Sequence, residues 1–136
     1  MYPLEIVKPM QQELENAGFS SLQTSQEVET ALQKEGTTLV VVNSVCGCAA
    51  GTCRPGAIAS LLADKKPTNL VTVFAGVDTD AVGTAREHMI PFPPSSPAIA
   101  LFKDGALVHM LERHHIEGRT AQVIAGNLAG AYEEFC

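Results

Sequence analysis

The 136-residue sequence predicts an α/β fold in which a mixed central sheet carries helices on both faces. Two continuous apolar runs, residues 37–45 and 69–77, are typical of strands buried on both faces of a parallel sheet. A third apolar segment, residues 98–102, continues through a Lys-Asp-Gly turn into residues 107–111, which predicts an antiparallel hairpin. Because helical patterns separate the first strands, those strands should run parallel, with the hairpin as an antiparallel edge.

Two helices are expected before the first buried strand. Apolar residues recur at helical spacing over residues 4–17, and Gly18 then offers a C-terminal stop. The second helix should begin after Thr24, because Thr24 and Glu27 form the Thr-x-x-Glu pattern of a capping box. It should turn its apolar residues inward and end near Gly36.

Three further helices should follow the first strand. The first covers residues 56–66, and its apolar side chains are expected to be buried, namely Ile58, Leu61 and Leu62. The next covers about residues 81–89, with Asp78 or Thr79 as its N-cap. The last begins after Arg119 or Thr120 and carries an apolar stripe to the end of the chain.

Composition and charge exclude several classes of protein. A chain of 136 residues with 46% hydrophobic and 18% charged residues can build one compact core. The 15 acidic and 9 basic residues give a net charge of −6, which argues against binding to nucleic acid or to anionic membranes. No apolar run approaches the roughly 20 residues of a membrane span. Charged residues occupy the N-terminal stretch where a signal peptide needs an apolar segment, so we expect a cytoplasmic location.

Three cysteines, Cys46, Cys48 and Cys53, lie within eight residues of the stretch NSVCGCAAGTCRP. Clustered thiols in the cytoplasm are more often catalytic or metal-binding than structural disulfides. A structural zinc site usually has four ligands in pairs at C-x2-4-C spacing. The three clustered cysteines do not have this spacing, and His114 or His115 would have to supply the fourth ligand. The pattern therefore favours redox exchange, with a metal site as the alternative.

The position of Cys46 favours a reactive thiolate. It follows directly after a predicted buried strand and precedes a helix, whose free N–H groups stabilise a thiolate over a thiol. Arg54 would add positive charge if it folds back toward the sulfur. Gly47 is the residue best able to adopt the backbone that a small Cys46–Cys48 disulfide ring requires.

The other two cysteines have less defined roles. Helical spacing puts Cys53 about two turns from Cys46, too far for a bridge without rearrangement. We interpret Cys53 as a small buried hydrophobe, with an auxiliary redox role as the alternative. Cys136 is the last residue and is interpreted as a bystander thiol, with a resolving or intermolecular role as the alternative.

The cysteine motif and the later segments closely resemble the bacilliredoxins. The matching stretches are VVVNSVCGCAAG, the following Arg54-Pro55, VTVFAG, PSSPAIALFKDG and VHMLERHHIEG, and the likeness runs nearly end to end and includes Cys136. The resemblance implies a thioredoxin-like three-layer fold in which residues 1–136 form a single domain with an N-terminal helical extension. One departure is Cys53, where the family usually has an apolar residue, and this leaves open which sulfur resolves Cys46.

The resemblance also implies roles for single residues. Cys46 would be the nucleophile and Cys48 the second cysteine of the CGC motif. Pro97 would be the cis-proline that faces the nucleophile in thioredoxin-like folds, and X-Pro bonds are those that adopt the cis form readily. The backbone of Ser96 would then be free to pair with an extended substrate.

The activity implied by the resemblance is that of a thiol–disulfide oxidoreductase that removes bacillithiol from mixed disulfides on cytoplasmic proteins. Bacillithiol would be a co-substrate, with no metal or organic cofactor. The alternatives are a protein disulfide isomerase that uses the same site and a thiol-based metal carrier. The expected partners are S-bacillithiolated or disulfide-containing proteins, with neither nucleic acid nor a membrane among them.

Overall fold

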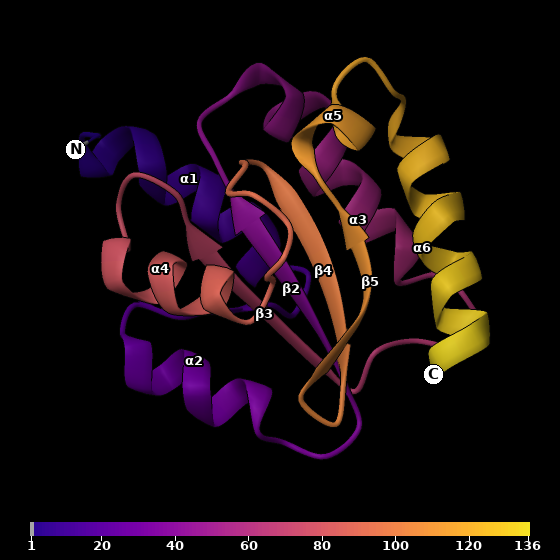
Figure 1. The fold of residues 1–136 in the computed structure, drawn as a ribbon. Helices are drawn as coiled ribbons and strands as arrows, with labels where there is room; N and C mark the ends of the chain where they lie inside the picture. The colour runs from indigo at the N-terminus through magenta and orange to yellow at the C-terminus, as the bar shows by residue number, and fades with distance from the viewer. Residues whose placement is uncertain (1) are drawn as a thin grey trace.

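A computed structural model describes residues 2–136 and contains one five-stranded mixed sheet (Figure 1). The order of the strands across the sheet is β1-β3-β2-β4-β5. The strands are β1 (Ser20–Ser21), β2 (Thr37–Asn43), β3 (Asn69–Phe74), β4 (Ala98–Lys103) and β5 (Ala106–Leu111). β1, β3 and β2 are parallel, while β4 pairs antiparallel with β2 and β5 antiparallel with β4. The predicted α/β class and the C-terminal hairpin are confirmed, whereas the two-residue β1 was not predicted.

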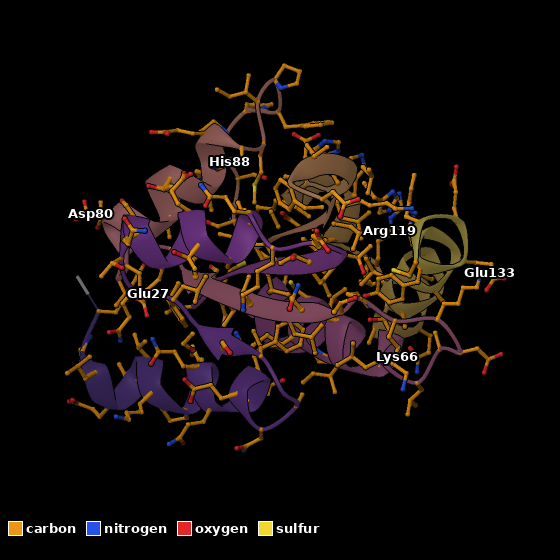
Figure 2. The ribbon with its side chains drawn as sticks, turned by 90° about the horizontal axis from the view of Figure 1, so that it is seen from below. Glu27, Lys66, Asp80, His88, Arg119 and Glu133 are labelled. Carbon is orange, nitrogen blue, oxygen red and sulfur yellow. The ribbon has the colours of Figure 1, made fainter. Side chains whose placement is uncertain are left out.

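Helices cover both faces of this sheet and give it two separate cores. The helices are α1 (Leu4–Glu15), α2 (Ser25–Leu32), α3 (Arg54–Ser60), α4 (Thr79–Glu87), α5 (Arg113–Ile116) and α6 (Ala121–Phe135). Leu39 and Val41 of β2 pack into the core under α1, α3 and α6, and Val40 and Val42 into the core under α2 and α4. Because both faces are covered, all seven residues of β2 are buried, as its continuous apolar run predicted. Figure 2 shows these layers from below, with the labelled polar side chains at the periphery.

The predicted starts of α2 and α6 are confirmed. Thr24 caps α2 in a reciprocal capping box with Glu27, and Thr120 accepts a hydrogen bond from the N–H of Val123 at the start of α6. Asp78 does precede α4, but its side chain accepts the N–H of Phe74 at 3.1 Å instead of capping the helix. The two confirmed caps each join residues three positions apart, so a short stretch of sequence was enough to predict them.

The expectation for Leu62 was wrong, since its side chain is 89% exposed. The reason is that α3 ends at Ser60, so the helical face that would have carried Leu62 inward does not continue. Ile58 and Leu61 remain half-buried against the core. The four-residue helix α5, which follows β5, was also not predicted.

The hairpin turn joins β4 and β5 through two residues in the left-handed region. Asp104 has φ 49° and Gly105 has φ 84°, as a tight two-residue hairpin turn requires. The Asp104 carboxylate accepts the N–H of Gly36 at 2.7 Å, and its own N–H donates to the Gly36 carbonyl at 2.8 Å. The turn is thereby tied to the loop that leads into β2.

No helix within residues 2–136 combines the length and the apolar character that crossing a bilayer requires.

Candidate active site

The CGC motif lies where β2 gives way to the helical segment that leads into α3. Ser44 accepts the N–H of Cys46 on its hydroxyl at 3.0 Å, immediately after the strand ends. The Cys46 carbonyl in turn accepts the N–H groups of Ala49 and Ala50, at 3.0 and 3.3 Å. A π-helical turn, Ala49–Cys53, then continues into α3. Hydrogen bonds to its N–H and carbonyl therefore hold the backbone of Cys46 at the carboxyl end of a central strand, where reactive groups gather in α/β sheets.

The sulfurs of Cys46 and Cys48 form the centre of the site. Both thiols are free and half-buried, and their Sγ atoms lie 2.7 Å apart in a hydrogen bond. The hydrogen bond from the Cys48 thiol lowers the pKa of Cys46, and the Cys48 N–H and a nearby guanidinium act in the same direction against partial burial. Burial raises the pKa of Cys48, and the neighbouring Cys46 adds to that effect. The pair therefore consists of one sulfur disposed to be a thiolate and one disposed to donate a proton.

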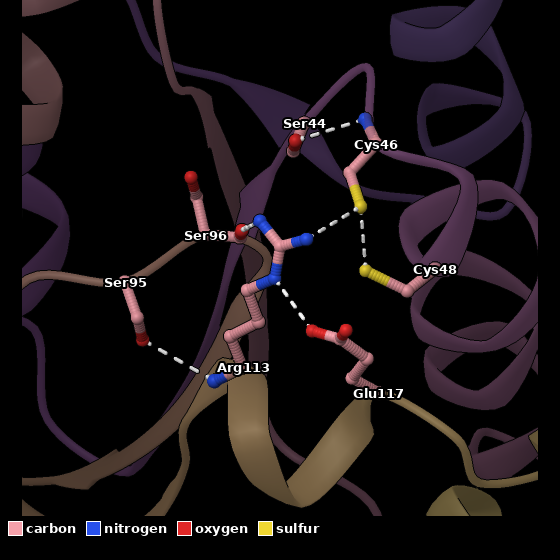
Figure 3. Close-up of polar contacts among 7 residues, drawn as sticks. All are labelled: Ser44, Cys46, Cys48, Ser95, Ser96, Arg113 and Glu117. Carbon is pink, nitrogen blue, oxygen red and sulfur yellow. Dashed lines mark hydrogen bonds and ion pairs between the residues drawn. The ribbon is translucent and has the colours of Figure 1, made fainter.

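The guanidinium beside this pair belongs to Arg113 at the start of α5 (Figure 3). Its Nη2 donates to the Cys46 sulfur at 3.3 Å, its Nη1 to the Ser96 carbonyl at 3.2 Å, and its Nε to the Glu117 carboxylate at 2.9 Å. The Arg113 backbone N–H donates to the Ser95 hydroxyl at 3.2 Å. Glu117 and then the Cys46 sulfur raise the pKa of Arg113, so it stays charged. Arg113 was not predicted as a site residue, because it lies 67 positions from Cys46 in the sequence, on a helix that was not predicted either.

Arg54 does not fold back toward the Cys46 sulfur and adds no positive charge beside it. Its side chain is 3% exposed and points into the molecule, where it bonds Glu13 at 2.9 Å, the Asn43 side-chain oxygen at 2.9 Å and the Ser44 carbonyl at 3.0 Å. A buried guanidinium needs such partners to offset its lost hydration, and Glu13 of α1 and the end of β2 provide them. Arg54 therefore supports the backbone that carries Cys46, while Arg113 contacts the sulfur.

The two remaining cysteines lie away from the sulfur pair. Cys53 is fully buried in the core under α3 and α6, and burial raises its pKa to about 12. This agrees with a small buried hydrophobe. The exposed Cys136 contacts Thr37 with its sulfur at 3.5 Å. Thr37 begins β2 whereas Cys46 follows its end, so the length of the strand, about 20 Å, separates Cys136 from the site.

The loop before β4 contains the predicted cis-proline. The Ser96–Pro97 bond is cis, as the resemblance implied, and the Ile90–Pro91 bond, which was not predicted, is cis as well. The Ser96 carbonyl accepts one hydrogen bond, from the Arg113 side chain at 3.2 Å. Arg86 also donates to this loop, through a 3.4 Å hydrogen bond to the Ser95 carbonyl.

The structure separates the histidines from the cysteines as possible metal ligands. Within residues 2–136, one group of three ligand-bearing side chains can converge on an ion, and it consists of Glu112, His114 and His115 on and beside α5. His114 and His115 are already hydrogen-bonded to Glu112, through its carboxylate and its N–H respectively. Among the described residues, no histidine lies close enough to the cysteines to form a metal site with them.

The fold and the sulfur pair together define a class of protein, the thiol–disulfide oxidoreductases with a thioredoxin fold. Solved structures of similar fold include a putative oxidoreductase with a thioredoxin fold, with a TM-score of 0.60 and 13% identity over 82% of this chain and 92% of that one. The reduced thioredoxin of Schistosoma mansoni aligns with a TM-score of 0.59 and 17% identity over 87% of this chain and 98% of that one. At these identities the likeness establishes the fold.

Sequence relatives establish the family. The model of the family described as Disulphide isomerase matches residues 2–136. A bacilliredoxin of Cytophaga hutchinsonii is 60% identical over 134 residues, which cover 98% of this chain and 99% of that protein. A bacilliredoxin of Halalkalibacterium halodurans is 52% identical over 136 residues, covering 99% and 94%. The chain belongs to the bacilliredoxin family and is a thiol–disulfide oxidoreductase.

Proposed function

We propose that this oxidoreductase removes bacillithiol from S-bacillithiolated cytoplasmic proteins, with Cys46 as the nucleophile and Cys48 as the second cysteine. The observation that carries the proposal is the contact between the two sulfurs, together with their opposite pKa directions and the guanidinium on Cys46. A thiolate is the form of cysteine that attacks disulfides, and a low pKa also makes the sulfur a better leaving group. Such a site suits reversible exchange.

The first step transfers bacillithiol to the enzyme. The Cys46 thiolate attacks the bacillithiol sulfur of the mixed disulfide, the old S–S bond breaks, and the protein cysteine leaves as a thiolate. A new S–S bond now joins Cys46 to bacillithiol. Arg113 stabilises the attacking thiolate, and the hydrogen bond from Cys48 does the same.

The second step can follow two routes. In the dithiol route, Cys48 loses its proton and attacks the Cys46 sulfur, which releases bacillithiol and leaves a Cys46–Cys48 disulfide. In the monothiol route, a free bacillithiol thiolate attacks the bacillithiol sulfur of the adduct, which releases oxidised bacillithiol and restores the Cys46 thiolate. The proposed cycle moves electron pairs between sulfur atoms alone and uses no metal or organic cofactor.

Mass spectrometry of a test protein that carries bacillithiol on one cysteine tests the assignment. The wild-type chain should release the bacillithiol, Cys46→Ser should abolish release, and Cys48→Ser should retain part of it when free bacillithiol is supplied. Cys136→Ser is the matched control and should release bacillithiol like the wild type, because its sulfur lies at the other end of β2. Full activity in Cys46→Ser would reject the assignment.

The family description supports disulfide isomerisation as a second candidate activity at the same site. It predicts that the reduced chain restores activity to an enzyme with scrambled disulfides, in an assay without bacillithiol. Release of bacillithiol without such restoration would leave the first activity alone.

A further inference from the structure

Glu117 is an acidic residue directed toward the sulfur pair, and the proposed cycle gives it no part. It ends the short helix α5, and its carboxylate accepts the Nε–H of Arg113 at 2.9 Å. Figure 3 shows this carboxylate directed toward the two sulfurs, beside the guanidinium that bonds Cys46. Burial and contact with Cys46 raise the pKa of Cys48, and the charge of Glu117 adds to them. Glu117 therefore acts on the thiol that would close the disulfide.

The charges that face Cys48 change once Cys46 carries a mixed disulfide. In the reduced site, among residues 2–136, three ionisable neighbours act on Cys48, namely the Cys46 thiolate, Arg113 and Glu117. The mixed disulfide makes Cys46 neutral, so one positive and one negative neighbour remain. Besides the effect of burial, Arg113 lowers the pKa of Cys48 and Glu117 raises it, and because the two are paired at 2.9 Å their effects largely cancel. Glu117 thus removes the support that Arg113 alone would give to a Cys48 thiolate.

A protonated Cys48 delays the dithiol route. Closure requires the Cys48 thiolate to attack the Cys46 sulfur of Cys46–S–S–R, so that the bond to R breaks, R–S⁻ leaves and the Cys46–Cys48 disulfide forms. The proton of Cys48 passes to solvent before this attack, because the thiolate and not the thiol is the nucleophile. A free thiolate that instead attacks the sulfur of R needs no ionisation of Cys48. The protonation of Cys48 therefore shifts the balance between the two routes.

We propose that Glu117 restrains closure of the Cys46–Cys48 disulfide and thereby keeps the Cys46 mixed disulfide available to a free thiol. This inference rests on the proposed function, because it concerns the adduct formed on Cys46. Glu117 acts on Cys48 by its own charge and through its pairing with Arg113. The nearby pair of Arg54 and Glu13 takes no part, because its charges act on the buried Cys53 instead.

Glu117→Gln removes the charge and keeps an oxygen that can accept from Arg113. Glu117 is 59% exposed, and a charge at such a site changes an equilibrium by about threefold. Below the midpoint of the pH–rate profile, threefold more Cys48 thiolate, offset by a lower nucleophilicity with a Brønsted slope of about 0.45, should make closure about twofold faster. Above the midpoint only the lower nucleophilicity remains, and closure should fall to about 0.6 of the wild-type rate. The two profiles should therefore cross.

Reaction with excess 5,5′-dithiobis(2-nitrobenzoate) separates the two steps in a Cys136→Ser background, in which Cys53 is buried. The first release of coloured thiolate marks attack by Cys46, and the second, at a rate independent of reagent concentration, marks closure by Cys48. Cys48→Ser in the same background should show the first release alone. Glu134→Gln removes the same charge from the exposed end of α6 and should leave the closure profile within about 1.2-fold of the background chain.

Competition with a free thiol measures the balance between the routes directly. The Cys46 adduct is mixed with 2-mercaptoethanol, quenched early by alkylation, and the disulfide and reduced forms of the chain are separated by mass spectrometry. Below the midpoint, the ratio of disulfide to reduced chain should be about twofold higher in Glu117→Gln, because closure is faster and attack by the free thiol is not.

Closure that is unchanged or slower in Glu117→Gln below the midpoint would overturn this inference, and slower closure would identify Glu117 as the acceptor of the Cys48 proton. Equal acceleration in Glu134→Gln would assign the effect to net charge and overturn it as well. An undiminished first release in Cys46→Ser would instead overturn the proposed function. Circular dichroism and thermal melting of both glutamine variants confirm that they fold.

Discussion

Replacing Arg54 by Met removes a buried guanidinium while keeping most of its apolar stem. Arg54 is 3% exposed and bonds Glu13, the Asn43 side chain and the Ser44 carbonyl at 2.9, 2.9 and 3.0 Å. Methionine is flexible and similar in volume to the stem, so a large cavity should not form. The cost of the substitution should therefore come from the acceptors that lose their donor.

The size of that cost follows from how each acceptor is placed. A buried acceptor left unpaired costs about 1–3 kcal/mol, and breaking a fully buried ion pair costs about 3–5 kcal/mol. Glu13 is 37% exposed and can turn to water, while the Asn43 oxygen keeps the N–H of Ser44 at 2.8 Å. The main loss is therefore at the Ser44 carbonyl. We expect Arg54→Met to lower the free energy of unfolding by about 2–3 kcal/mol and Tm by about 8–10 °C.

Urea unfolding of the reduced chain, followed by circular dichroism, measures this effect. Glu13→Gln is the matched control, since it removes the charge of the exposed partner and keeps an oxygen acceptor. It should cost less than about 1 kcal/mol. A loss below about 0.5 kcal/mol in Arg54→Met, the usual range of surface substitutions, would refute the reasoning, as would equal losses in the two variants.

Three further predictions concern Cys53 and three glycines. The pKa of buried Cys53 is raised to about 12, so its contribution to stability is full below the ordinary thiol pKa near 9.0 and is lost as the pH rises toward 12. The stability of the wild type relative to Cys53→Ala should therefore fall by about 1.4 kcal/mol per pH unit above roughly pH 9, and parallel curves would contradict this. Gly56→Ala would place a Cβ 2.7 Å from Ile124 and should destabilise the chain by about 1–3 kcal/mol in urea unfolding. Gly126→Ala, in open space on α6, should instead stabilise it by about 0.5–1 kcal/mol, and the reverse order would refute the packing argument. A Cβ added by Gly47→Ala would have no atom within 4 Å, so the reduced form should stay equally stable. The Cys46–Cys48 disulfide should form more slowly, because glycine best adopts the backbone of the small ring, and the loss of free thiols over time measures this rate.

Much of the fold was predictable because it depends on short stretches of sequence. The buried run of β2, the capping box at Thr24 and the Asp104-Gly105 turn each depend on neighbours within a few positions. Sequence also located the cysteine pair, since strand ends in α/β sheets gather reactive groups. The predictions that failed concern where an element stops. Leu62 is exposed because α3 ends at Ser60, which the apolar pattern alone does not reveal.

The site was less predictable because its electrostatics depend on contacts between distant residues. The guanidinium on Cys46 comes from Arg113, 67 positions further along the chain. It arrives there on α5, a helix of four residues that is too short to leave a periodic pattern. The hydrogen bond that the Ser96 carbonyl accepts also comes from Arg113. Cys53, in contrast, is buried, as the first of the two interpretations drawn from the sequence predicted.

The two arginines near the motif differ in what they can do to a thiolate, and burial explains the difference. Arg54 is next to the motif in sequence, but a buried cation must be fully paired, and its donors are committed to Glu13, Asn43 and Ser44. Arg113 remains partly exposed and donates directly to the Cys46 sulfur. Substitution of Arg54 should therefore change the fold first and the chemistry only through it. Substitution of Arg113 should change the reactivity of the Cys46 thiol while the fold stays intact. Measuring both stability and thiol reactivity in the two variants therefore separates structural support from direct action on the reacting sulfur.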